Sequence, residues 1–98
     1  MKPRKATDIK SSLLQKGFRQ HDTDHSYFWF FYENRQTSIR TKVSYGIKEY
    51  GDNLLAKIRK QMRLGGRELD EFFDCDMTGD GYGQLLIERG HVKVTKKK

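Results

Sequence analysis

The chain has 98 residues, with 20 Lys and Arg against 13 Asp and Glu, and a formal net charge of +7. This length suits one domain with a modest core, and the charge favours a polyanionic partner such as nucleic acid, an acidic protein or an anionic membrane. No apolar stretch approaches the roughly 20 residues of a membrane span, and the polar start predicts no signal peptide. The single cysteine, Cys75, excludes an internal disulfide framework and fits a cytoplasmic location.

The first predicted element is a helix over residues 8–16, after a basic lead over residues 1–6. Thr7 is a candidate N-cap, and apolar side chains recur at helical spacing from Ile9 to Leu14. Gly17 suits the left-handed residue that follows many helices, with Phe18 as the apolar residue after it. The helix is therefore expected to end at Lys16.

Three strands follow, over residues 18–20, 25–32 and 37–43, separated by turns at 22–24 and 33–35. The second strand holds an unbroken aromatic run from Tyr27 to Tyr32. In the third, Ile39, Thr41 and Val43 alternate with Ser38, Arg40 and Lys42. Such alternation predicts one covered sheet face and one open face.

Residues 44–51 are expected to form a loop, and helical periodicity returns at Asp52 and ends at Gly65-Gly66. Two short helices should follow, one around 69–73 and one capped by Thr78 that ends near Gly90. The predicted fold class is α+β, with the order α-β-β-β-α of double-stranded-RNA-binding domains. A three-stranded antiparallel sheet carries helices on one face. Residues 1–98 are read as one domain, with a core over about 8–64, a helical extension over 67–90, and basic tails at 1–6 and 93–98.

The run Leu13-Leu14-Gln15-Lys16-Gly17-Phe18, followed by a histidine that opens an aromatic strand, resembles the HicA family. The segment from Ser38 to Val43, then Gly51-Asp52 and a basic helix, adds to the resemblance, as does Phe72-Phe73-Asp74-Cys75. HicA proteins are small mRNA-interferase toxins with a fold like that of double-stranded-RNA-binding domains. The resemblance implies RNA as substrate, a HicB-type antitoxin as partner, and His25 as the catalytic residue.

His25 is the candidate general acid or base, because histidine titrates near neutral pH. The family has a Gly-Ser-His or Gly-Thr-His triplet here, whereas this chain has Thr23-Asp24-His25. Asp24 puts a negative charge where a phosphate should approach. The alternative is therefore a surface histidine that caps the turn through Asp22 or Asp24.

Basic side chains form the predicted nucleic-acid contact. Arg40 and Lys42 are placed to hold a phosphate, and the loop and second helix extend the positive surface. The predicted binding residues are Arg40, Lys42, Lys48, Lys57, Lys60 and Arg63. The alternative is an ordinary solvated sheet and helix surface.

The aromatic run must divide by parity between the two sheet faces, as Tyr27/Trp29/Phe31 and Phe28/Phe30/Tyr32. Outward-facing aromatics either stack on unpaired bases or form a protein interface. The second interpretation is favoured at this stage.

The segment Asp74 to Gly81 resembles a calcium loop but lacks the glutamate that must close it, because Leu85 or Ile87 stands at that position. A turn into a helix capped by Thr78 accounts for it better, and Cys75 is read as a buried apolar residue. No metal and no cofactor are expected.

The resulting hypothesis is an RNA-binding, HicA-like protein that cleaves RNA without a metal through His25. The first alternative is a non-catalytic module of the same fold that binds structured RNA or, less favoured, DNA. The second is a protein-interaction domain whose aromatic sheet face forms a homodimer or meets an acidic partner.

Overall fold

The computed structural model describes residues 3–44, 46–74 and 77–92. Within these ranges, nine elements follow one another. They are β1 (Arg4–Lys5), α1 (Ala6–Gln15), β2 (Phe18–Asp22), β3 (Ser26–Tyr32), β4 (Arg35–Val43), β5 (Glu49–Tyr50), α2 (Asp52–Met62), α3 (Gly66–Phe73) and α4 (Gly79–Glu88).

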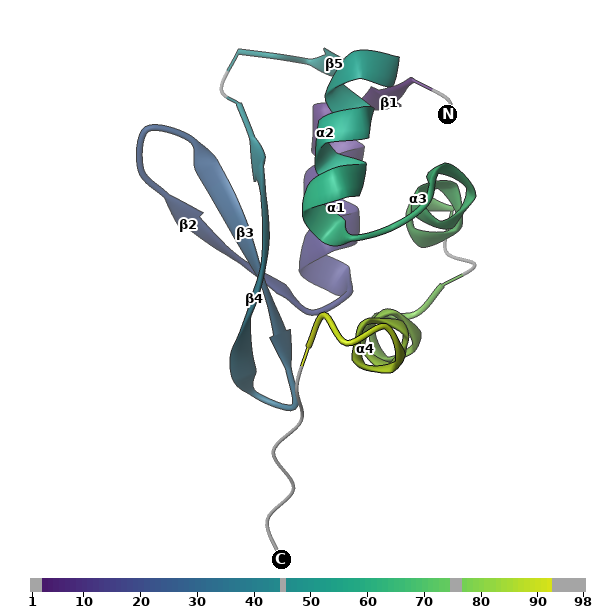
Figure 1. The fold of residues 1–98 in the computed structure, drawn as a ribbon. Helices are drawn as coiled ribbons and strands as arrows, with labels where there is room; N and C mark the ends of the chain where they lie inside the picture. Colours follow the sequence, from purple (N-terminus) through teal and green to yellow (C-terminus); the bar gives the residue numbers. More distant parts are fainter. Residues whose placement is uncertain (1–2, 45, 75–76, 93–98) are drawn as a thin grey trace, which may run out of the picture.

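The central feature is an antiparallel sheet in the order β2-β3-β4. The four helices of the described residues, α1 to α4, lie on one side of this sheet, and none of them covers its other side (Figure 1). The predicted α+β architecture is thereby confirmed. None of the described helices is long and apolar enough to cross a membrane.

The inner face of the sheet, which meets the helices, forms the core. Phe28 and Phe30 of β3 are almost fully buried, since alternate residues of a strand point to opposite faces. The predicted inward set of β4, Ile39, Thr41 and Val43, is buried as well. Apolar side chains of α1 and α2 cover them, namely Ile9, Leu13, Leu55, Ile58 and Met62.

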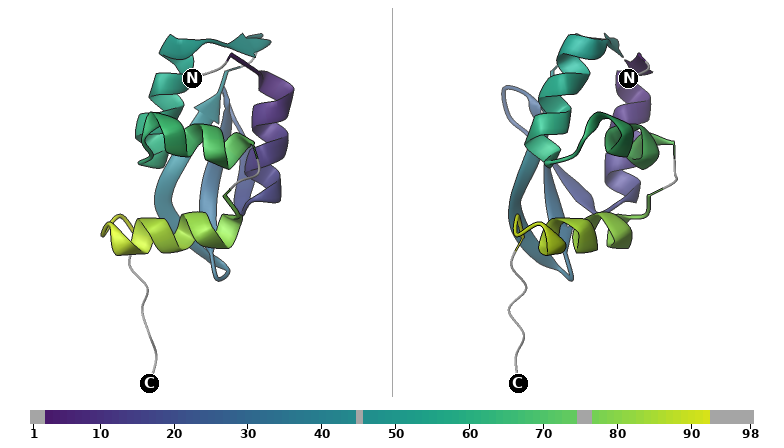
Figure 2. Two further views of the ribbon diagram at one scale, coloured as in Figure 1. Left: turned by 90° about the vertical axis from the view of Figure 1, so that its right-hand side faces the viewer. Right: turned by 45° about the vertical axis from the view of Figure 1, so that its right-hand side comes forward.

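The C-terminal helices contribute to the same core. The ring of Tyr82 in α4 lies 4.9 Å from that of Phe30 and 5.3 Å from that of Phe72 in α3. Its hydroxyl donates to the Met62 carbonyl at 2.7 Å, and burial raises its pKa. Figure 2 shows α3 and α4 crossing the direction of α1 and α2. The extension therefore completes the core.

The predicted start of the first helix was wrong. The helix begins at Ala6 with Lys5 as N-cap, so Thr7 lies within the first turn. The cause is a two-stranded pairing of β1 with β5, which lie in segments predicted to be a tail and a loop. The Ala6 amide donates to the Lys48 carbonyl at 2.8 Å, which fixes the chain as it enters the helix.

The predicted turns are largely confirmed. Gly17 has φ +99°, and its carbonyl accepts from the Phe31 amide at 2.9 Å. Glu33 and Asn34 both have positive φ between β3 and β4. The Thr78 hydroxyl accepts from the Gly81 amide at 2.9 Å, as an N-cap does. The strand predicted over residues 18–20 is β2, which extends further, to Asp22. The strand predicted to begin at residue 25 is β3, which begins one residue later, at Ser26.

Candidate nucleic-acid interface

The outer face of the sheet, which lies opposite the helices, carries a row of aromatic side chains. Tyr27, Trp29 and Phe31 of β3 point to this face and are half-buried. Residues directly opposite one another in neighbouring antiparallel strands share a face. Trp29 is opposite Arg19 on β2 and Arg40 on β4. The sequence left the choice between the two parity sets open, and the structure assigns Tyr27, Trp29 and Phe31 to the outer face.

Guanidinium groups lie over these rings. The Cζ atom of Arg19 is 4.1 Å from the centroid of the Phe31 ring. The Cζ atom of Arg40 is 5.3 Å from the Trp29 ring and 5.7 Å from the Tyr27 ring. Cation–π attraction acts at such distances. It holds both arginines against the sheet and so limits the entropy lost when they bind a ligand.

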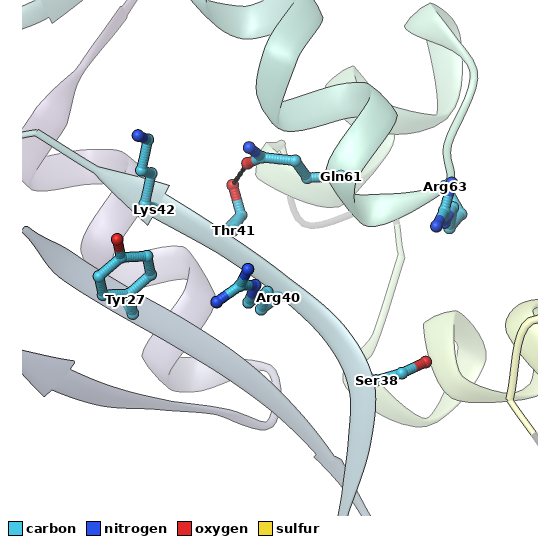
Figure 3. A pocket seen from close by; sticks show the side chains of 7 residues that line it. All are labelled: Tyr27, Ser38, Arg40, Thr41, Lys42, Gln61 and Arg63. Atoms are coloured by element: carbon cyan, nitrogen blue, oxygen red, sulfur yellow. Dashed lines mark hydrogen bonds between the residues drawn. The ribbon is translucent and has the colours of Figure 1, made fainter.

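A pocket of about 320 Å³ lies along β4, which is an edge strand. Figure 3 shows Arg40 and Lys42 projecting from β4, Tyr27 from β3, and Arg63 just beyond α2. The Thr41 hydroxyl donates to Oε1 of Gln61 at 2.6 Å and joins β4 to α2. We call Arg40, Lys42 and Arg63 the β4 cations. The pocket lining includes no acidic residue, and no ion pair of the β4 cations occurs among the described residues.

Arg63 has an unusual backbone. It ends α2 with φ +62° and ψ +39°, in the left-handed region that glycine usually occupies. A side chain at such a position costs about 1–2 kcal/mol. The side chain is exposed and lines the pocket along β4. The conformational strain of the backbone therefore occurs at a residue whose side chain lines the pocket of the β4 cations.

A second hollow, of about 360 Å³, lies between β2 and β3 on the outer face. Trp29 and Phe31 supply its apolar wall. The remaining lining side chains carry hydrogen-bonding groups and are Arg19, Gln20, His21 and Gln36. The aromatic row is thus hollowed on its β2 side and bordered by cations on its β4 side.

The other predicted binding residues lie at different distances from this face. Lys57 is exposed one helical turn before Gln61, on the flank of α2 nearest β4. Lys60 is exposed further around the helix. Lys48 lines a separate hollow of about 680 Å³ with Lys5 and Lys10, beside β1. The structure brings together three of the six predicted residues, Arg40, Lys42 and Arg63.

Several cations have a structural role instead. Arg4, counted with the basic lead, donates to Asp70 at 3.0 Å and to Asp74 at 2.9 Å. Lys16 is buried, donates to the Phe72 carbonyl, and lies over the Phe72 ring. Arg89 pairs with Glu68. Arg4, within the segment predicted to be a basic tail, therefore joins β1 to α3, while residues 93–98 of the second predicted tail lie outside the described residues.

His25 lies half-buried in the bend between β2 and β3, at one end of the aromatic row. Its ring is 6.4 Å from that of Tyr27, at 60°. Tyr27 also lines the pocket of the β4 cations, so one aromatic ring adjoins both groups.

Two aspartates flank this histidine. A hydrogen bond from the Thr23 hydroxyl lowers the pKa of Asp24, and one from the Gln20 amide lowers the pKa of Asp22. Both groups stay negatively charged near neutral pH. They repel a phosphate on their own side of the bend.

Sequence reasoning missed Arg19 and His21 and left the outward aromatic set undecided. The signal was the parity of Phe18, because a buried Phe18 places Arg19 and His21 on the outer face. Within the described residues there is no group of three His, Cys, Asp or Glu side chains suited to a metal. Cys75 and Asp76 of the calcium-loop candidate lie outside the described residues.

Searches of family models, curated proteins and solved structures give no match to this chain.

Proposed function

We propose that this protein binds RNA through the outer face of its sheet, with the β4 cations as the contact for backbone phosphates. The observation that supports this is the convergence of Arg40, Lys42 and Arg63 on one pocket without an acidic side chain in its lining. Arginine binds phosphate through two parallel hydrogen bonds, and lysine adds a point charge. Unneutralised charges so close together repel one another, and a polyanion relieves that repulsion.

The test compares two double variants that remove the same charge. Arg40→Gln/Lys42→Gln alters the β4 cations, whereas Lys10→Gln/Lys48→Gln alters the separate hollow beside β1. Binding of a labelled RNA oligonucleotide is followed by anisotropy from 50 to 200 mM salt. The slope of log K against log salt should fall by about 1.4 in the first variant, at about 0.7 for each lost contact. Equal losses in both variants would reduce the proposal to unspecific charge attraction.

A second candidate function is metal-independent RNA cleavage of the HicA kind, with His25 as general acid or base. The contact of His25 with Tyr27, beside the cationic pocket, favours it. The histidine would move a proton at the 2′-hydroxyl or at the leaving oxygen, and Arg40 and Lys42 would hold the phosphate between them. A HicB-type antitoxin would then be the protein partner.

Cleavage is tested on a denaturing gel with cellular RNA in EDTA. The native protein, His25→Ala and His91→Ala are run together, because His91 is an exposed histidine after α4 that lines neither hollow of the outer face. Cleavage by the native protein and His91→Ala but not by His25→Ala supports the catalytic role. Intact RNA in every lane, together with salt-dependent binding, leaves a non-catalytic binding module.

A further inference from the structure

We infer that the aromatic row Tyr27/Trp29/Phe31 stacks unpaired bases, so that the outer face is a site for single-stranded nucleic acid. This inference rests on the proposed function and specifies which form of RNA the face accepts. It differs from the interpretation favoured from the sequence alone, in which the outward-facing aromatic side chains form a protein interface.

The strand register places the rings and the cations in columns. Tyr27 lies opposite Lys42, and Trp29 lies opposite Arg40. Phosphates bound along β4 would therefore have their bases directed over β3. Successive outward residues of a strand are about 6.7 Å apart, which separates neighbouring rings enough for each to meet a different base. Sheet domains that bind RNA stack two or three bases on such aromatics.

The charge of the face favours nucleic acid over an apolar partner. Arg19 and Arg40 lie against the rings, and a protein surface packed on them would have to desolvate both guanidinium groups. Such burial is unfavourable unless the partner supplies carboxylates in matching positions. Nucleic acid supplies phosphates, and its bases stack on guanidinium planes as well as on aromatic rings.

Beside the aromatic row, which would stack the bases, the hollow next to β2 would hold a base by its edge. Its apolar wall is Trp29 and Phe31, and His21 and Gln36 place hydrogen-bonding groups around it. Its volume of about 360 Å³ lies within the roughly 300–1,000 Å³ of small-ligand pockets. A paired base hides its hydrogen-bonding edge and one or both faces, so a duplex cannot use this hollow. Single strands are therefore preferred.

Trp29 is the only tryptophan of the chain, so its emission reports the state of this site directly. The protein is titrated with a 2′-O-methyl uridine octamer, which a 2′-hydroxyl-dependent nuclease cannot cleave, and with a matched 2′-O-methyl duplex. We expect the octamer to quench the Trp29 emission and to bind at least 10-fold more tightly than the duplex. Unchanged emission, with the same octamer bound by anisotropy, would overturn the inference and leave the proposed function intact.

Variants separate stacking from folding. Trp29→Ala should weaken octamer binding about 5- to 150-fold, which corresponds to the loss of one stacked base, and Trp29→Phe should recover most of it. Leu14→Ala is the matched control, because Leu14 is an exposed apolar residue on the helical side. Equal octamer binding by Trp29→Ala and the native protein would overturn the inference. So would salt-insensitive self-association that Trp29→Ala abolishes, which would identify the face as a dimer interface.

Discussion

The cations of the helical side and those of the outer sheet face have different surroundings. Arg4 lies between two aspartates, Arg89 pairs with Glu68, and Lys16 donates to a carbonyl inside the protein. The β4 cations have no ion pair among the described residues. The first group joins segments far apart in the sequence, such as β1 and α3. The β4 cations thus join no segments of the fold through an ion pair, which is expected of side chains that serve a binding surface.

The two faces of β3 differ in the same way, and truncation on each face gives the largest expected contrast. Phe30→Ala should lower the free energy of unfolding by about 3–5 kcal/mol, because it opens a cavity beside Phe18 and Tyr82. Trp29→Ala should lower it by about 1 kcal/mol, since the ring is only half-buried. Urea denaturation of both variants measures the difference. Similar losses would mean that the outer row is structural.

The paired and unpaired cations can be compared next. Lys16→Ala should destabilise the protein by about 2 kcal/mol, because the Phe72 carbonyl loses a charged donor. Its RNA affinity should not change once the protein is folded. Arg40→Ala should do the opposite, with nearly unchanged stability and weaker RNA binding. Thermal unfolding measures the stability and anisotropy measures the RNA affinity of the same samples. A large stability loss in Arg40→Ala would refute the division into structural cations and binding cations.

Arg63 sharpens the comparison, because its backbone and its charge act in opposite directions. Arg63→Gly should raise the free energy of unfolding by about 1 kcal/mol, as glycine takes φ +62° without strain. The same variant should bind RNA more weakly, because one of the β4 cations is lost. Increased stability with unchanged RNA affinity would remove Arg63 from the site.

The smallest expected effect is a change of stability with pH, which depends on Glu68 on the helical side. Hydrogen bonds from Arg89, and next from the Gly65 amide, lower the pKa of Glu68 below its usual value of 4.5. A carboxylate with a lowered folded pKa stabilises the protein above the unfolded pKa and ceases to do so as pH falls through the folded pKa. Stability should therefore decline slightly below pH 4.5.

Urea midpoints between pH 6 and pH 3 test this linkage. Glu68→Gln should show less of the decline, and Arg89→Gln should lie between it and the native protein, because the Gly65 amide still donates to Glu68. A decline of the same size in all three proteins would assign it to other carboxylates.

The fold was predictable where local patterns repeat. The alternation of Ile39, Thr41 and Val43 gave the inner face of β4, and Gly17, Thr78 and Gly90 marked helix ends with the expected geometry. The pairing of β1 with β5 escaped prediction, because two-residue strands carry no periodicity and their partners are more than 40 residues apart.

The candidate site was predictable only in part. Arg40 and Lys42 follow from strand parity, since their neighbours Ile39 and Val43 are plainly apolar. Arg63 could be assigned to a basic helix, but its convergence with β4 depends on how α2 packs against the sheet. The position of Lys48 in a separate hollow could not be predicted for the same reason, because charge along the sequence does not show which lysines share a surface.

The most direct test of the account is an amide and indole chemical-shift titration of the labelled protein with a short single-stranded RNA that cannot be cleaved. The account predicts shifts for the Trp29 indole and for the amides of β3, β4 and Arg63, with little change in α3. Shifts confined to the hollow of Lys5, Lys10 and Lys48, or to the helices, would contradict the assignment of the outer sheet face as the RNA-binding surface.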